Sequence, residues 1–553
     1  MKSTHLSLIA GAAVLAAVTG FATVTAPGPP AKTAAKSATV LPVERSSLVC
    51  PAPSGSDLAE TRYTAFTPAG EGGDAEGTAE LKPALPVVDD EDETDPKKIE
   101  KAEEAAKKAK EKADKPVLAV KEPGKPVTAE ADGASAPALA GTATGRLAPG
   151  WAAQQTTEVT AGGARGLLGV SCTAPDTDFW FPGVSTAKTR QDYLHLTNPD
   201  DSAAVADIEL YGTEGALKSE VGDGITVPAR SSVAVLLSTL TDEAADRLTA
   251  HVTTRSGRVG AVVMSAEDGA GSDWISASDD PSGTLVLPGI PADATSVELV
   301  AYAPGEDDAD VKVRLVGKNA TFSPAGSATL HVKSSMTAVV DLKDVTRGEP
   351  ASLLLTPVRK DRATPIVAAL RVVRGKGDKQ EIAYIPATGP VGARATVADN
   401  RGKEATLSLT APGATAEVKV TASAGSEGGE PVVETHTVKG GTTLAVTPKA
   451  PEGLKGAYAL TVETTSGGPV HASRTLARTE GGVPMFTVQT LPDDRGTVEV
   501  PAARQDLSQS CPYRGSTDSG ESPSSSATCS TTTSCTSRAR SSRLFVRSST
   551  GRR

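Results

Sequence analysis

The sequence is poor in aromatic residues and in clustered positive charge. Aromatic residues make up 3% of the 553 residues, so any hydrophobic core must be built from the smaller Val, Leu, Ala and Ile side chains. The formal net charge of −11 argues against nucleic acid as a partner, because nucleic-acid-binding proteins concentrate Lys and Arg to neutralise phosphates. We therefore expect small β-domains with aliphatic cores that bind no nucleic acid.

Motifs for catalysis and metal binding are also missing. The six histidines are scattered singly, without HExxH, HxH or CxxC spacing, and no GxSxG motif or Gly-rich phosphate loop follows a strand pattern. Acidic pairs such as Asp176 and Asp178 do not follow the EF-hand order and are typical of solvated turns. We expect no enzymatic activity, no catalytic residue, no cofactor and no metal ion.

Long apolar runs are absent except at the N-terminus. The stretch from Leu6 to Ala26 has no charged residue and follows Lys2 and His5, as in a secretory signal. It is also about long enough to span a membrane, which takes roughly 20 residues, so residues 1–26 are a signal peptide or an uncleaved signal anchor. We expect a secreted or envelope-associated, extracytoplasmic protein that meets the membrane only through this segment.

Cysteine is scarce, with five in the chain. Cys50 and Cys172 are the two outside the C-terminal tail, and each precedes a similar turn, Cys-Pro-Ala-Pro or Cys-Thr-Ala-Pro. In an oxidising compartment we expect them to form a disulfide, closing a loop worth on the order of 4–5 kcal/mol in the chain-entropy model. The alternative is two separate thiols, and we assign no role to the three tail cysteines.

Shifts in composition divide the chain. Residues 27–45 predict a flexible spacer, and residues 46–69 a β segment that joins the first module. Residues 70–145 predict a disordered charged insertion, because the Lys/Glu/Ala block within it has no apolar face; a solvated helix is the alternative. Residues 508–553 predict a disordered Ser/Thr/Arg-rich tail; a shifted reading frame is the favoured interpretation, and a genuine Ser/Thr-rich stalk is the alternative.

The remaining sequence alternates apolar and polar residues between turn formers, which is typical of β-sandwiches. Two landmarks recur about every hundred residues, strand-end prolines and turn prolines. The first set is Pro182, Pro288 and Pro386, and the second is Pro199, Pro304 and Pro412. Each repeat has room for about seven strands, too many for one propeller blade. We expect an all-β fold of about three tandem immunoglobulin-like β-sandwich modules, at residues 146–280, 281–378 and 379–507.

One aromatic cluster, Phe179-Trp180-Phe181, stands out. Alternation places Phe179 and Phe181 on one face of a strand and Trp180 on the other, which favours core packing over a sugar-binding platform. Trp180 and Trp274 remain the candidate ligand contacts.

Several short motifs resemble a known family. They are Leu41-Pro42-Val43-Glu44-Arg45, Cys50-Pro51-Ala52-Pro53, Cys172 with Asp178-Phe179-Trp180-Phe181-Pro182-Gly183, Leu196-Thr197-Asn198-Pro199 and Ser272-Asp273-Trp274. They resemble an actinobacterial family of exported proteins, the domain of unknown function 5719. The resemblance implies a location in the envelope of a high-GC Gram-positive organism, and it brings no established activity.

Two classes of function follow from this sequence. The first is a non-catalytic exported or cell-envelope protein with a structural or adhesion-type role. The second is a binding module or assembly helper for cell-envelope polysaccharide, which predicts an exposed groove containing Trp180 or Trp274. The candidate partners are accordingly envelope polysaccharide or protein.

Overall fold

The computed structural model describes residues 39–70, 76–86, 113–219, 221–402 and 404–500. Its regular elements are strands, together with three single turns of 3₁₀ helix, so the expected all-β class is confirmed. The predicted signal segment, the spacer up to residue 38 and the predicted tail 508–553 lie outside the described residues.

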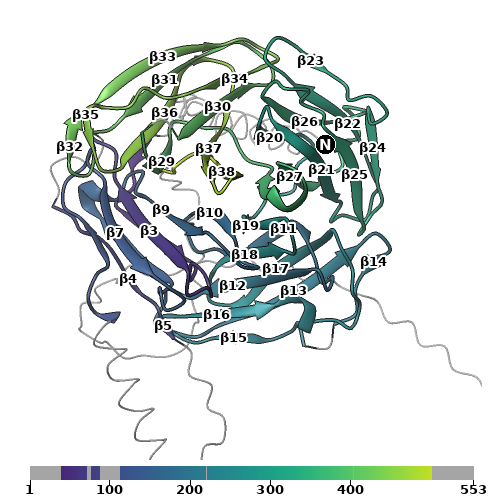
Figure 1. The fold of residues 1–553 in the computed structure, drawn as a ribbon, viewed down its shortest axis with the longest axis horizontal. Helices are drawn as coiled ribbons and strands as arrows, with labels where there is room; N and C mark the ends of the chain where they lie inside the picture. Colours follow the sequence, from purple (N-terminus) through teal and green to yellow (C-terminus); the bar gives the residue numbers. More distant parts are fainter. Residues whose placement is uncertain (1–38, 71–75, 87–112, 220, 403, 501–553) are drawn as a thin grey trace, which may run out of the picture. The chain divides into compact units, whose positions relative to one another are not determined.

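The described chain forms four β-sandwiches (Figure 1), each with eight main strands in the same order. Numbered along each copy, the strands form one sheet in the order 1-6-3-4 and a second sheet in the order 8-7-2-5, with antiparallel pairing throughout. Each copy thus contains two facing sheets and is not a single propeller blade.

The strand bounds follow the copies. The first copy contains β2 (Arg45–Cys50), β3 (Ala59–Phe66), β4 (Ala79–Pro83), β6 (Leu118–Val120), β7 (Val127–Asp132), β8 (Leu139–Thr144), β9 (Ala152–Val159) and β10 (Gly166–Ser171). The second contains β11 (Asp178–Val184), β12 (Arg190–Thr197), β13 (Ala204–Gly212), β15 (Ile225–Val227), β16 (Ser231–Leu236), β17 (Leu248–Ser256), β18 (Gly260–Glu267) and β19 (Gly271–Ile275). The third contains β20 (Leu285–Ile290), β21 (Ala294–Tyr302), β22 (Ala309–Val316), β24 (Thr329–Val332), β25 (Thr337–Lys343), β26 (Ala351–Pro357), β27 (Val367–Arg374) and β28 (Glu381–Pro386). The fourth contains β29 (Ala395–Asn400), β30 (Ala405–Ala411), β31 (Ala416–Ala422), β33 (Val432–Val438), β34 (Thr442–Val446), β36 (Tyr458–Gly467), β37 (His471–Glu480) and β38 (Val483–Thr490).

Small aliphatic side chains fill the sandwiches, as the shortage of aromatic residues predicts. In β13 the buried residues Ala204, Ala206, Ile208 and Leu210 alternate with more exposed neighbours, so one face of the strand packs into the core. The strands β22 and β31, which hold the same place in the next two copies, show the same alternation. The cores are therefore built mainly from Ala, Val, Leu and Ile side chains.

The first sandwich is the main departure from the predicted organisation. Residues 46–69 do not join another module but supply the first strands of a sandwich of their own. Strands β4, β6, β7 and β8 lie within residues 70–145, so the prediction of a disordered insertion is wrong for these residues. The charged stretch misled the prediction because residues 87–112, which lie outside the described part, separate the third and fourth strands of this copy.

The turn prolines mark equivalent positions, but one of the strand-end prolines does not. Pro199, Pro304 and Pro412 each follow the second strand of a copy. Pro182 and Pro288 both lie in first strands, and each precedes a glycine with positive φ, +101° at Gly183 and +91° at Gly289, where the strand pairing shifts. Pro386 lies in the eighth strand of its copy, so its predicted equivalence is wrong. The match arose because a buried closing strand and a buried opening strand share the same apolar pattern.

The predicted disulfide is present. Cys50 ends β2 and Cys172 follows β10, and their Cα atoms are 4.5 Å apart. The backbones of Val49 and Thr173 hydrogen-bond to each other beside it. The disulfide therefore joins the first and last strands of the first sandwich, across its two sheets.

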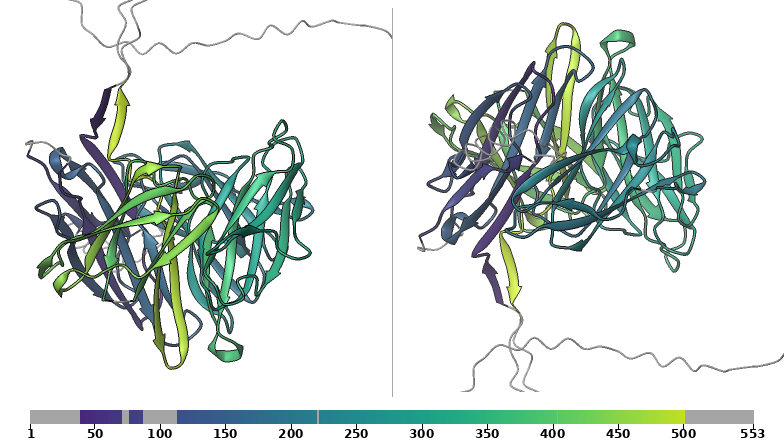
Figure 2. Two further views of the ribbon diagram at one scale, coloured as in Figure 1. Left: turned by 90° about the horizontal axis from the view of Figure 1, so that it is seen from above. Right: turned by 90° about the horizontal axis from the view of Figure 1, so that it is seen from below.

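Five pairings in the described chain involve strands outside the eight-strand order, and two of them reach beyond a single sandwich. β5 (Leu85–Pro86) leaves the first sandwich and pairs in parallel with β16 of the second. β1 (Thr39–Pro42) pairs with β39 (Thr497–Val500), forming a two-stranded ribbon that projects away from the sandwiches (Figure 2).

Candidate functional site

The eighth strands of the four sandwiches meet. β10 packs against β19, β19 against β28, β28 against β38, and β38 against β10, which closes the cycle; three of them are labelled near the middle of Figure 1. We call this place the central junction. Glycines allow the close approach: a Cβ atom at Gly169 would lie 1.9 Å from the side-chain nitrogen of Gln489.

Asp273, on β19, is a buried carboxyl in the central junction. Its Oδ1 accepts hydrogen bonds from the Thr487 hydroxyl at 3.0 Å and from the Gly169 N–H at 3.4 Å, so it ties together strands of three sandwiches. Its Oδ2 has no hydrogen-bond partner among the described residues. Burial raises the pKa of Asp273 well above the usual value.

Glu381, at the start of β28, is the second buried carboxyl there. Its Oε2 lies 3.7 Å from the Arg165 guanidinium, whose Nη2 donates to the Gln380 carbonyl at 2.5 Å. Burial raises the pKa of Glu381 to about 9; Arg165 opposes this rise, and nearby Asp273 adds to it. The carboxyl is therefore protonated at neutral pH.

Side-chain hydrogen bonds and ion pairs also join neighbouring sandwiches around the central junction. Arg371 of the third sandwich donates two hydrogen bonds to Glu267 of the second, at 2.7 and 2.9 Å. Ser352 and Thr410 join the third to the fourth through a hydroxyl contact of 2.7 Å.

The fourth sandwich is joined back to the first. Asp399 accepts a hydrogen bond from the Thr156 hydroxyl at 2.7 Å, and the side-chain Oε1 of Gln154 accepts from the backbone N–H groups of Ala398 and Asp399. Burial raises the pKa of Asp399, but Arg401 outweighs this effect and holds it below its usual value. An ionised, paired carboxylate therefore stands at this boundary.

A buried ion pair supports the boundary between the second and third sandwiches. The Arg190 guanidinium donates to Asp192 at 2.6 Å and to the Ser265 hydroxyl at 2.8 Å, and Ser265 in turn contacts the Tyr384 hydroxyl at 3.0 Å. Both charged side chains are almost fully buried. The ion pair itself lies within β12, and two contacts link it to the third sandwich: the Ser265–Tyr384 contact and the Arg190 guanidinium 5.7 Å from the centre of the Tyr384 ring.

Neither tryptophan proposed as a ligand contact lies in an exposed groove. Trp180 is 7% exposed and lies between His251 and Tyr302, with ring centroids 3.6 and 5.4 Å away. Trp274 is 2% exposed and meets the His195 ring edge to face. The two tryptophan rings do not lie together. The prediction of an exposed polysaccharide-binding groove at Trp180 or Trp274 is therefore wrong. Both rings serve packing between sheets instead.

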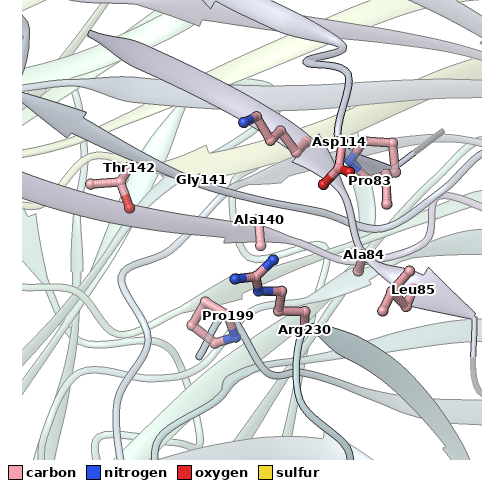
Figure 3. Close-up of a pocket in the computed structure, with 11 residues that line it drawn as sticks. Pro83, Ala84, Leu85, Asp114, Ala140, Gly141, Thr142, Pro199 and Arg230 are labelled. Atoms are coloured by element: carbon pink, nitrogen blue, oxygen red, sulfur yellow. The ribbon is translucent and has the colours of Figure 1, made fainter. Parts of the chain in front are cut away.

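One cavity, of about 440 Å³, lies between the first and second sandwiches. Asp114 and Arg230 both line it, with Arg230 next to Pro199 and with Ala140 between the two charged side chains in the view of Figure 3. Arg230 is already paired with Asp201, and its backbone is held at φ +52°.

A smaller cavity of about 160 Å³ lies where the first, second and fourth sandwiches meet. His195 and Gln489 line it, and each has buried polar side-chain atoms without a hydrogen-bond partner among the described residues. Burial lowers the pKa of His195 to about 4, so its imidazole is neutral at ordinary pH.

Sequence patterns did not single out most of these polar groups. Asp273 belongs to a quoted motif, but Glu381, Arg190 and Asp399 were missed. The available signal was a charged residue within or beside an otherwise apolar strand, as in Glu381-Ile382-Ala383-Tyr384-Ile385. In the described part of the chain, no three His, Cys, Asp or Glu side chains gather as a metal centre. No helix there is long and apolar enough to cross a membrane.

The fold and the central junction define a class of all-β proteins built from repeated sandwiches with interlocked closing strands. Within it, the chain belongs to the family of unknown function DUF5719, which it matches over residues 127–449. The match runs from the fifth strand of the first sandwich to just beyond the fifth strand of the fourth. No curated protein matches the chain.

Proposed function

We propose that this chain is a non-catalytic, exported protein of the cell envelope that serves as a structural or adhesion-type scaffold. The observation that carries the proposal is the central junction, in which four sandwiches are held by shared buried polar contacts. An arrangement fixed in this way supports loops at defined positions, which is what a scaffold requires. The disulfide and the signal-like N-terminus fit an extracytoplasmic location.

The proposal is tested by fractionating actinobacterial cells that express the full-length chain. We expect the chain in the washed envelope or the medium, with Cys50 and Cys172 linked in non-reducing peptide maps. The matched control is the Cys50→Ala/Cys172→Ala double variant, which should reach the same compartment with lower resistance to protease. Cytoplasmic chains with alkylatable Cys50 and Cys172 would contradict the proposal.

A second candidate function is binding or assembly of envelope polysaccharide. The cavity lined by His195 and Gln489 favours it, since a concave site with a few unpaired polar groups is the usual form of a small-ligand site. Retention of the pure protein on insoluble cell-wall glycan, compared with retention on cellulose, tests this function.

A further inference from the structure

The 160 Å³ cavity is formed by three sandwiches together, so it exists only when the central junction is assembled. Each sandwich contributes polar and apolar walls, and six representative lining residues are Val170, Thr173, His195, Ser276, Gln489 and Thr490. The disulfide partner Cys50 also lines it. The cavity is therefore a product of the arrangement rather than of one module.

The charge of the lining selects the ligand. None of the residues that line this cavity is Asp, Glu, Lys or Arg, and the one titratable ring, His195, is kept neutral by burial. A carboxylate, phosphate or ammonium ion would lose its hydration there without an opposite charge. The occupant must be uncharged.

The hydrogen-bonding groups of the lining require a polar occupant. The hydroxyls of Thr197 and Ser171 are already engaged, with Ser232 and Gln154. By contrast, the buried Nε2 of His195 and the buried Nε2 and Oε1 of Gln489 have no hydrogen-bond partner in the described chain. A plain hydrocarbon would leave these donors and acceptors unmatched.

The volume of the cavity and its apolar lining residues further limit which chemical group can occupy it. A cavity of about 150 Å³ holds benzene, so one of about 160 Å³ has room for a group of similar size but not for a whole sugar ring with its hydroxyls. Phe179, Val170 and Val262 supply apolar surface for a methyl group. An acetamido group combines a methyl with a planar N–H donor and C=O acceptor, so it satisfies all of these demands.

We propose that this cavity binds the uncharged acetamido group of an N-acetylated sugar, with the sugar ring left at its mouth. The site goes beyond the scaffold role proposed above, and either can fail without the other. The acetamido group could belong to a free sugar or to the end of a glycan chain, which share this chemistry.

Saturation-transfer NMR and calorimetry on the oxidised full-length chain provide the test. We expect N-acetylglucosamine to bind, with the strongest saturation at its acetyl methyl, and glucose to bind at least tenfold more weakly. The affinity should not depend on salt, because no ion pair forms. Equal binding of the two sugars, or no binding of either the monosaccharide or its oligomers, would overturn the proposal.

Oligomers distinguish the two sources. Chitin oligomers that bind more tightly than the monosaccharide would identify a glycan end, whereas equal affinity would identify the free sugar. Deacetylated chitosan oligomers should not bind in either case. If they bind as well as chitin oligomers, recognition does not involve the acetamido group and the proposal is wrong.

Variants locate the site. Ala277→Leu fills the cavity and should weaken binding at least tenfold, while Ala338→Leu, a change at another half-buried alanine, should not. Thr490→Val removes one hydroxyl while keeping the shape and should weaken binding severalfold; Thr142→Val, in the larger cavity, is its control. Melting temperatures show which variants remain folded. Wild-type affinity in a folded Thr490→Val protein and in a folded Ala277→Leu protein would place the site elsewhere.

Discussion

The interiors of the sandwiches and the central junction are both buried, yet they are built from opposite chemistry. The sandwich cores consist of aliphatic side chains such as Leu299, Leu370 and Val397. The junction and the boundaries around it place carboxyls, guanidinium groups and amides against strands of other sandwiches. Aliphatic contacts are non-directional and tolerate sliding, whereas hydrogen bonds do not. The cores therefore stabilise each copy, and the polar junction specifies how the copies meet.

The sharpest way to break this comparison is to remove one charge from a buried pair. Arg190→Met leaves Asp192 buried without its cation, which should lower the free energy of unfolding by about 3–5 kcal/mol. Urea unfolding measures the change. Arg359→Met, in the exposed pair with Asp361, is the matched control and should leave the urea midpoint unchanged. If the two substitutions changed the free energy of unfolding equally, burial of the Arg190–Asp192 pair would make no contribution to stability.

The next largest effect is expected from a substitution that creates a cavity within the core of one sandwich. Leu370→Ala removes a fully buried side chain of the third sandwich and should cost about 2–5 kcal/mol, through lost burial and the cavity left behind. The control is Val433→Ala at an exposed position of the fourth sandwich. We expect the arrangement of the sandwiches, followed by small-angle scattering, to persist in Leu370→Ala. A change in scattering at a temperature where the variant is folded would mean that the core also specifies the arrangement.

A smaller effect is expected when one hydrogen bond of the junction is lost. Thr487→Val keeps the side-chain shape but removes the hydroxyl that donates to Asp273, so the free energy of unfolding should fall by about 1–3 kcal/mol. Thr435→Val, at an exposed site in β33, serves as the control. Chemical denaturation of both proteins decides the matter, and indistinguishable curves would remove Thr487 from the set of junction contacts.

Counted per pH unit, the smallest expected effect is in the pH dependence of stability. The pKa of Glu381 is about 9 in the folded chain and near 4.5 when unfolded, so the folded state holds one more proton between these values. Stability from this group is therefore full below about pH 4.5 and declines as pH rises toward 9, by up to about 1.4 kcal/mol per pH unit.

Glu381→Gln has no proton to lose and should flatten this decline between pH 5 and 9. Asp273, whose pKa is also raised, will leave part of the slope in place. Melting temperatures across the pH range measure the effect, with Glu499→Gln on the exposed ribbon as the control. A variant curve parallel to that of the wild type would show that Glu381 is ionised in the folded chain.

Local pattern was sufficient for part of the fold. The all-β class and the turn prolines follow from alternation and turn chemistry that any short window contains. The disulfide joins residues 122 apart and was predictable because Cys50 and Cys172 are the two cysteines outside the tail. The first sandwich escaped prediction because its short strands, such as Leu118-Ala119-Val120, lie next to a charged stretch whose composition outweighs theirs. The junction escaped because its contacts join residues far apart in sequence, such as Arg474 and Gln154. No periodicity in one strand reveals which distant strand will face it.

The ribbon of β1 and β39 gives the molecule an unusual response to force. Thr39 lies opposite Val500, so the two ends of the described chain enter and leave side by side. A pull on both ends would open the ribbon one pair at a time, in the manner of a zipper, before any load reached the sandwiches. If only one end of the chain were held, the four sandwiches would be attached through the ribbon alone, and their other surfaces would remain accessible to binding partners. Single-molecule stretching from residues 39 and 500 should thus show a weak early opening, followed by separate high-force events as each sandwich yields.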